Sequence, residues 1–273
     1  MSKAYTQPGK NPTDTNQANK VLQGDCLELM KDIPDGSVDL ILADLPYGTT
    51  QCKWDAIIPL EPLWEQYKRI IKENGAIVLT SSQPFTSSLI MSNPKMFRYE
   101  IIWEKERPTN IFFMKKQIGK VHENVLVFYK KQPTYNPQMQ ERDVKTGNSG
   151  NDDYSKYRNN GSLTHRNQKY QTSKDYDFKK RYPRSIVYFP RDLQKNKDRH
   201  PTQKPVALFE YLIKTYTNEG DLVLDNVAGS GTTAIACMNT NRRYILIEKE
   251  LDYIELINKR LELNKERRND QSS

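Results

Sequence analysis

Two short segments carry the residue types with which this chain could do chemistry at one site. The first is Asp-Leu-Pro-Tyr at residues 44–47, directly after an apolar run at residues 38–43. The second, residues 225–233, starts with an aspartate and continues into a glycine-rich turn. A carboxylate, a rigid turn and an aromatic ring in the first segment, with a glycine turn in the second, predict a site that holds a flat ring bearing an amine against a bound cofactor.

The first segment suits group transfer to an amine. If Asp44 accepts a hydrogen bond from an exocyclic amine, the carbonyl of Leu45 accepts the other proton, and the nitrogen lone pair points at an electrophile. Pro46 makes the turn rigid, and Tyr47 is placed to stack on the ring. Taken alone, an Asp followed by a Pro is equally typical of an ordinary β-turn.

The second segment suits an adenosine cofactor. Gly229 and Gly231 permit a tight turn, and Thr232 begins a predicted helix whose free N–H groups favour an anion. Glu248 follows the next predicted strand, where its carboxylate can bind both ribose hydroxyls. The loop alone does not separate a nicotinamide cofactor from another adenosine cofactor, and helix–strand packing also explains an isolated glycine turn.

Strand-like and helix-like segments alternate around these motifs. Strands are predicted at residues 21–23, 38–43, 76–80, 101–103, 125–129, 222–224 and 244–247, and helices at residues 62–72, 205–216, 232–239 and 251–263, with a helix stop at residues 73–75. This alternation predicts an α/β fold, a Rossmann-like and mostly parallel sheet with helices on both faces. Ligands bind beyond the carboxyl ends of such strands, where four acidic residues stand: Asp25, Asp44, Asp225 and Glu248.

Residues 134–199 differ from the rest in composition. They hold 15 Lys and Arg against 8 Asp and Glu, together with seven Tyr. Basic side chains neutralise phosphates and aromatic rings stack on bases, so the stretch predicts a loop-rich insertion that contacts nucleic acid. A solvated insertion without a specific role is the alternative. The residues predicted to contact phosphate are Lys179, Lys180, Arg181 and Arg184.

Overall composition supports a globular protein with a polyanionic partner. The chain has 273 residues and a formal net charge of +8, and no apolar stretch is long enough to span a membrane. Three scattered cysteines predict neither disulfides nor a zinc site and favour a reducing cytoplasm. His122 and Glu123 lack a second histidine at helical spacing, so we expect a turn there, without metal.

Three motifs resemble those of DNA amino-methyltransferases. Residues 44–47 are similar to the family's D/N-P-P-Y/F/W motif, residues 225–233 to its D-P-F-x-G-S-G-T-T loop, and residues 200–205 match its H-P-T-Q-K-P element. Their order along the chain is that of the circularly permuted beta class. The resemblance covers roughly residues 21–263 and implies a class I methyltransferase fold.

The resemblance implies S-adenosylmethionine as methyl donor and an exocyclic nitrogen of a DNA base as acceptor. An aspartate at the start of the first motif favours N6 of adenine, and the base then has to flip out of the duplex. The catalytic roles fall to Asp44, Leu45, Pro46 and Tyr47. The cofactor roles fall to Asp25, Cys26, Phe85, Thr202, Lys204, Asp225, Gly229, Gly231, Thr232 and Glu248.

The same resemblance frames the domain organisation. We expect a flexible tail at residues 1–20, a catalytic half at residues 21–133, a target-recognition insertion at residues 134–199, a cofactor half at residues 200–265 and a polar tail at residues 266–273. Homodimerisation and membership of a restriction–modification system are both compatible with the family. No membrane partner is expected.

Two departures from the family pattern leave other functions open. Leu45 replaces a proline, and Asn226-Val227 replaces Pro-Phe, which removes an aromatic ring near the cofactor. Phe85 is either a substitute cover for the donor or a core residue, and Trp103 is either core or part of the base pocket. The alternatives are methylation of cytosine N4, of RNA or of a protein amide, and a non-catalytic DNA-binding relative.

Overall fold

The computed structural model describes residues 19–48, 56–141, 180–192 and 203–272. Of the residues predicted for the site, Thr202 and Lys179 lie outside these ranges. The chain forms two compact units, one made of Met1–Asn136 with Ser185–Ser273 and the other of Pro137–Arg184. Each unit is described below by itself.

The larger unit is built on an eight-stranded sheet in the order β1-β10-β9-β2-β3-β5-β4-β8. The strands are β1 (Lys20–Gln23), β2 (Val38–Asp44), β3 (Ile71–Ser81), β4 (Phe97–Glu104), β5 (His122–Phe128), β8 (Ile186–Tyr188), β9 (Leu222–Asp225) and β10 (Arg243–Glu248). Neighbouring strands are parallel except where β5 pairs with β3 and β4. The mostly parallel sheet predicted from the alternation of elements is therefore confirmed.

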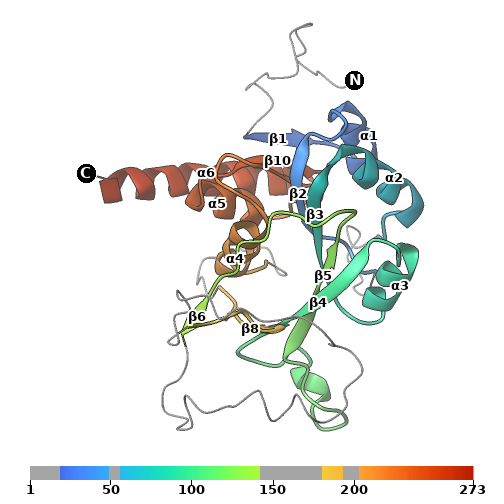
Figure 1. The fold of residues 1–273 in the computed structure, drawn as a ribbon. Coiled ribbons are helices and arrows are strands. Elements are labelled where there is room, and N and C mark those ends of the chain that lie inside the picture. Colours follow the sequence, from blue (N-terminus) through green and yellow to red (C-terminus); the bar gives the residue numbers. More distant parts are fainter. Residues whose placement is uncertain (1–18, 49–55, 142–179, 193–202, 273) are drawn as a thin grey trace, which may run out of the picture. The chain divides into compact units, whose positions relative to one another are not determined.

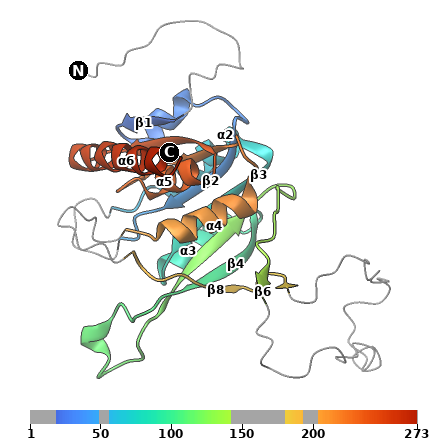
Figure 2. The same ribbon diagram turned by 90° about the vertical axis from the view of Figure 1, so that its left-hand side faces the viewer.

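Helices cover both faces of this sheet, as Figures 1 and 2 show. One face carries α1 (Cys26–Leu29), the short η2 (Met30–Asp32), α2 (Leu60–Ile70) and α3 (Phe85–Ser92); the other carries α4 (Val206–Tyr216), α5 (Thr232–Asn239) and α6 (Leu251–Ser272). Successive side chains of a strand point to opposite faces. Accordingly, Leu40 and Leu42 join the core under α4, α5 and α6, while Ile41 and Ala43 join the core under α1, α2 and α3.

The boundary between α2 and β3 differs from the prediction. The helix ends at Ile70, and β3 begins at Ile71, so residues 73–75 are not a helix stop but part of the strand. Val38 pairs with Ile71 and Leu40 with Ala76, which leaves the intervening residues of β3 as a bulge. A Cβ on Gly75 would lie 2.8 Å from the Ile71 side chain, so glycine serves close packing in this bulge.

One strand of the main sheet comes from the predicted insertion. β8 pairs in parallel with β4, so residues within 134–199 complete the edge of the sheet. In the smaller unit, β6 (Gln140–Glu141) and β7 (Lys180–Arg181) form an antiparallel pair. The recognition role of this segment, like the domain boundaries, stays a prediction. None of the described helices combines the length and apolarity needed to cross a bilayer.

Candidate active site

The four acidic residues predicted at strand ends line one cavity of about 980 Å³. Asp25 follows β1, while Asp44, Asp225 and Glu248 are the last residues of β2, β9 and β10. These strands are parallel, so their carboxyl ends meet at one edge of the sheet. The cavity at that edge joins the two segments that the sequence predicted to act together.

Asp44 is held by hydroxyl groups on one of its oxygens. Asp44 pairs in register with Thr80 of β3, and the Thr80 hydroxyl donates a short hydrogen bond to Asp44 Oδ1. The Tyr47 hydroxyl donates to the same oxygen at 2.7 Å. Burial and the neighbouring Asp44 carboxylate raise the pKa of Tyr47 well above its usual value, so this hydroxyl remains a donor. Leu45 and Pro46 line the cavity beside Asp44.

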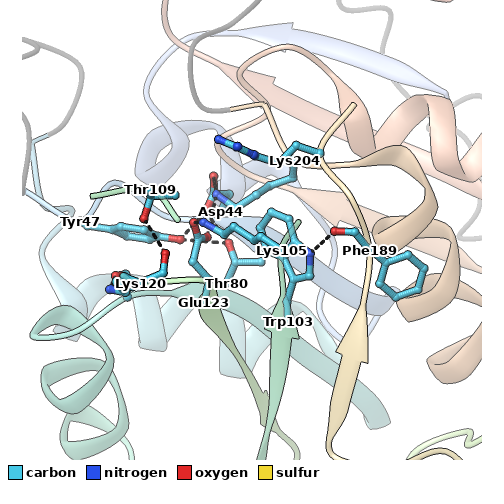
Figure 3. A network of polar contacts seen from close by, with 12 residues as sticks. Asp44, Tyr47, Thr80, Trp103, Lys105, Thr109, Lys120, Glu123, Phe189 and Lys204 are labelled. Atoms are coloured by element: carbon cyan, nitrogen blue, oxygen red, sulfur yellow. Dashed lines mark hydrogen bonds and ion pairs between the residues drawn. The ribbon is translucent and has the colours of Figure 1, made fainter. Parts of the chain in front are cut away.

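The other oxygen of Asp44 faces a buried ammonium group. Lys204 Nζ lies 2.5 Å from Asp44 Oδ2 and 5.6 Å from the centre of the Tyr47 ring (Figure 3). Burial disfavours the charged form of Lys204, but the carboxylates of Asp44 and Glu123 outweigh this and raise the pKa of the lysine. The site therefore already stabilises a positively charged nitrogen between a carboxylate and an aromatic face.

Glu123 is a cavity residue that the sequence analysis missed. Its segment was expected to be a turn, and that prediction was wrong, because His122 begins β5 and Glu123 is its second residue. Since β5 runs antiparallel to its neighbours, its first residues lie at the edge where the other strands end. The sequence analysis inspected only the residues that follow each strand. In the antiparallel strand β5, it is the first residues of the strand that lie at this edge.

Glu123 links Lys204 to a second buried lysine. Lys105 Nζ makes a short ion pair with Glu123 Oε1, and Lys204 Nζ lies 3.4 Å from Glu123 Oε2. Burial alone would raise the pKa of Glu123, but the two lysines outweigh it and lower that pKa. Burial lowers the pKa of Lys105 in spite of Glu123. Acidic and basic groups thus alternate from Asp44 through Lys204 and Glu123 to Lys105 (Figure 3).

Aromatic side chains frame this chain of charges. The Phe85 and Tyr47 rings are stacked with their centres 5.5 Å apart. Phe85 is buried in the core and is not among the residues that line the cavity, so donor contact by Phe85 stays a prediction. Trp103 is both core and cavity wall, and its indole N–H donates to the Phe189 carbonyl at 2.8 Å. Lys105 Nζ lies 4.9 Å from the centre of the Trp103 ring.

The glycine loop also lines the cavity, through Gly229, Ser230 and Thr232. Glu248 Oε2 accepts a hydrogen bond from the Gly229 backbone N–H at 2.7 Å, and Oε1 accepts from the N–H groups of Lys249 and Glu250. Gly231 caps α5 with φ = +75°, and no side chain caps that helix. A Cβ on Gly231 would lie 2.9 Å from Ile257 Cγ1, so both the backbone conformation and the packing require glycine there.

Asp225 anchors this loop from beneath. Its carboxylate accepts hydrogen bonds from the Thr233 hydroxyl at 2.5 Å and the Val227 N–H at 3.1 Å. Burial raises the pKa of Asp225 to about 7, and the two hydrogen bonds offset only part of that effect. Thr232 lines the cavity, and its hydroxyl lies 3.4 Å from the carbonyl of Lys204. The segment around Lys204 is thereby joined to the start of α5.

The remaining predicted residues have mixed placements. Asp25 and Cys26 line the cavity, and Asp25 Oδ1 caps α1 by accepting from the Leu27 N–H at 2.9 Å. Lys180, Arg181 and Arg184 belong to the smaller unit. In the part of the chain that the structure describes, no three His, Cys, Asp or Glu side chains come together as metal ligands.

Comparison with known proteins decides the family. A family model described as DNA methylase matches residues 38–259. The chain belongs to this family of DNA methylases. The methylase is 30% identical over 263 residues to the DNA adenine methyltransferase YhdJ of Escherichia coli (strain K12), covering 91% of the chain and 84% of YhdJ. It is 27% identical to the type II methyltransferase M.HpaI of Haemophilus parainfluenzae, covering 89% and 74% of the two proteins.

Solved structures support the same fold. The crystal structure of the M1.HpyAVI-SAM complex is similar to the methylase with a TM-score of 0.58 and 25% identity, over 88% of this chain and 98% of that one. The cytosine-N4-specific PvuII DNA methyltransferase has a TM-score of 0.61 at 16% identity, over 87% and 84% of the two chains. The predicted class I methyltransferase fold is confirmed, whereas the circular permutation stays a prediction.

Proposed function

We propose that this DNA methylase transfers a methyl group from S-adenosylmethionine to the exocyclic N6 amine of an adenine in DNA. The observation that carries the proposal is the pairing of Asp44 with an ammonium group beside the Tyr47 ring. An amine that gains a methyl group becomes positively charged in the transition state and needs the same surroundings as that ammonium. The name of YhdJ, a DNA adenine methyltransferase, supports adenine in DNA as the acceptor.

The cavity residues fit the donor. The uncapped start of α5 suits the donor's carboxylate, and Glu248, fixed by three backbone N–H groups, suits the ribose hydroxyls. Asn226 lines the cavity, and its side-chain nitrogen is buried without an acceptor among the described residues, while its oxygen accepts from Tyr67. An unsatisfied donor of this kind suits a ligand acceptor such as a ring nitrogen.

The chemistry then divides simply between donor and protein. S-adenosylmethionine supplies an electrophilic methyl group, and no general base needs to deprotonate the amine beforehand. Asp44 and the carbonyl of Leu45 accept hydrogen bonds from the two N–H groups of the amine, which leaves the nitrogen lone pair free to attack. Asp44 would stabilise the positive charge on the nitrogen as the C–N bond forms and the methyl–sulfur bond breaks. S-adenosylhomocysteine would leave as the neutral thioether, and one proton of the methylated amine would pass to solvent.

Entry of the base requires Lys204 to release Asp44. Glu123 Oε2 already forms a 3.4 Å ion pair with Lys204 Nζ, so Glu123 is the acceptor toward which the ammonium moves. This exchange keeps the buried lysine paired throughout, which avoids an uncompensated buried charge. Glu123 therefore acts as a positioning residue for Lys204.

Incubation of the purified chain with methyl-labelled S-adenosylmethionine tests the function, with mixed-sequence duplex DNA, RNA and a protein mixture as acceptors in parallel reactions. Nucleoside analysis should place the label on 6-methyladenine. Label on 4-methylcytosine would change the acceptor, and label on RNA or protein alone would exclude DNA as substrate. Absence of label from every acceptor would support a non-catalytic DNA-binding protein. Methylome sequencing of cells that express the chain would then identify the recognition sequence.

The basic cluster of the smaller unit is the predicted phosphate contact. Replacing Lys180, Arg181 and Arg184 together by alanine should weaken DNA binding by a similar factor for all sequences, and should reduce the slope of log affinity against log salt by about 3. An unchanged slope would place the phosphate contacts elsewhere. Base flipping, homodimerisation, a restriction–modification partner and a cytoplasmic location remain predictions.

A further inference from the structure

The segment between β4 and β5, residues 105–121, carries a group of exposed apolar side chains. Phe112 is 99% exposed and Ile118 is 93% exposed, and more than half of Ile111 and of Phe113 is also exposed. Figures 1 and 2 show this green segment, here called the β4–β5 hairpin, extending beyond the end of the sheet. Clustered exposed apolar side chains are typical of a contact surface.

The tip of the β4–β5 hairpin is held in place by its own hydrogen bonds. Ile111–Phe113 forms the short 3₁₀ turn η3. The Asn110 side chain bridges the two arms, donating to the Ile118 carbonyl at 3.0 Å and accepting from the Lys120 N–H at 2.6 Å. A Cβ on Gly119 would lie 3.0 Å from Pro108, which shows how closely the arms pack. Phe112 is thus presented at the tip of a preorganised turn.

The base of the hairpin lies at the rim of the active-site cavity. Thr109 and Lys120 close it, with the Thr109 N–H donating to the Lys120 carbonyl at 2.9 Å. Both residues, together with Asn110, line the cavity that contains Asp44. Figure 3 shows Thr109 and Lys120 next to Tyr47. A partner that covers the exposed tip therefore also reaches the mouth of the cavity.

The charge of the hairpin indicates the chemistry of that partner. Residues 105–121 contain one acidic side chain, Glu106, which pairs with Arg191, and five basic ones: Lys105, Arg107, Lys115, Lys116 and Lys120. Apolar side chains set among basic ones match a nucleic acid, in which phosphates surround the apolar faces of bases. A second copy that met this surface through its own hairpin would bring the same basic side chains to the same place, and like charges repel.

On this basis, and resting on the proposed function, we propose that the β4–β5 hairpin is a wedge that enters duplex DNA at the target adenine. Phe112 stacks in the space that the flipped base leaves, and Lys115 and Lys116 contact the flanking phosphates. An enzyme that acts on a paired base has to offset the lost stacking and pairing, and an inserted aromatic ring restores part of the stacking.

The test uses an unmethylated duplex that contains the recognition sequence found by methylome sequencing, with 2-aminopurine in place of the target adenine. Its fluorescence should rise when wild-type protein flips the base, and Phe112→Ala should largely abolish the rise. On the corresponding adenine duplex, Phe112→Ala should lower kcat/KM about 10- to 100-fold, the range expected for loss of one stacked aromatic ring. Phe112→Trp should retain most of the activity.

Three controls separate the wedge from other causes. With an abasic site opposite the target adenine, Phe112→Ala should regain most of its rate, because the base is already unpaired. Leu263→Ala removes an exposed apolar side chain from α6 and should change neither flipping nor rate. Donor affinity and the thermal unfolding midpoint of Phe112→Ala should equal those of wild type, which would show an intact fold.

Two results would overturn the wedge. Wild-type flipping and rate in Phe112→Ala would show that the ring does not enter the duplex. A change of molar mass in Phe112→Ala on size-exclusion chromatography, with flipping unchanged, would make the hairpin a surface between two copies of the chain. By contrast, failure of the wild-type protein itself to methylate any DNA would refute the proposed function, which distinguishes the two failures.

Discussion

Lys204 Nζ lies within 2.5 Å of Asp44 Oδ2, although 160 residues separate the two in the sequence. The lysine comes from the segment before α4, and the aspartate ends β2. Their pairing brings the predicted catalytic motif and the predicted cofactor segment into one charge network. The consequences of removing either side of that network can be measured.

Replacement of Asp44 should separate catalysis from donor binding. Asp44→Ala removes the acceptor for the amine and should lower kcat by about 10²- to 10³-fold or more. The donor affinity should remain largely intact, because the glycine loop is built from β9, α5 and β10. Single-turnover methylation and calorimetric titration of the donor measure the two effects. The exposed Asp35, which pairs with Arg69, supplies a control in Asp35→Ala. Equal losses of rate and of donor affinity would contradict the role of Asp44.

Replacement of Glu123 should hinder entry of the base. Glu123→Gln keeps the shape of the side chain but loses the negative charge that Lys204 needs when it leaves Asp44. We expect kcat/KM for DNA to fall about tenfold or more, as for loss of one charge-assisted hydrogen bond, and the donor affinity to fall less. Glu73→Gln, which alters an exposed ion pair with Lys131, is the matched control. A fall in donor affinity as large as that in kcat/KM would assign Glu123 to the donor site.

Substitution of two glycines with positive φ should separate the cost of backbone strain from the cost of lost packing. Gly231 has φ = +75° and lies against Ile257, whereas Gly220 has φ = +81° with nothing within 4 Å of an added Cβ. Gly220→Ala should cost about 1–3 kcal/mol of unfolding free energy through strain alone. Gly231→Ala should cost more and should also weaken donor binding. Urea denaturation and donor titration of both variants measure this, and equal costs with unchanged donor affinity would argue against the predicted cofactor loop.

Asp225 predicts a specific dependence of stability on pH. Its pKa is about 7 in the folded chain, against 3.8 without the protein environment, so the folded state holds the proton more tightly. The contribution of Asp225 to stability is therefore fully present below pH 3.8 and is lost as the pH rises toward 7, by about 1.4 kcal/mol per pH unit.

Asp225→Asn removes this titration. Relative to wild type, the unfolding free energy of the variant should rise between pH 4 and pH 7 and then level off. Urea denaturation of both proteins at half-unit pH steps gives the difference directly. Because only the change of this difference with pH is interpreted, a constant offset from altered hydrogen bonds does not matter. A difference that is flat across this range would show that Asp225 does not titrate there.

Residues whose position follows from strand direction could be predicted from the sequence. Asp44, Asp225 and Glu248 end parallel strands, and the alternation of apolar runs with helical segments is enough to predict that they lie at one edge of the sheet. The position of Glu123 at this edge could not be predicted in the same way. Antiparallel pairing of β5 depends on contacts with β3 and β4, and the short apolar run at residues 125–129 carries no mark of its direction.

The exposure of the hairpin side chains also could not be predicted from the sequence. Phe112 and Ile118 belong to residue types that are usually buried, and only the folded hairpin shows that they are not. The bulge at Gly75 could not be predicted for a related reason. A glycine after a helix is a common stop signal, and the close contact with Ile71 appears only in the folded structure. Local patterns thus predicted most of the longer elements but not α1, α3 or β8, and contacts between elements decided the details.

The pairing of β2 with β9, which is far along the chain, has a consequence for synthesis of the protein on the ribosome. A growing chain that has been synthesised through β5 already possesses Asp44, Tyr47 and Glu123, yet it lacks the central neighbour of β2 and the lysine that neutralises Asp44. The residues predicted to bind the cofactor are complete only when translation has passed Glu248, the last residue of β10. We therefore expect an unfinished chain to methylate no DNA, because it lacks β9, β10 and Lys204.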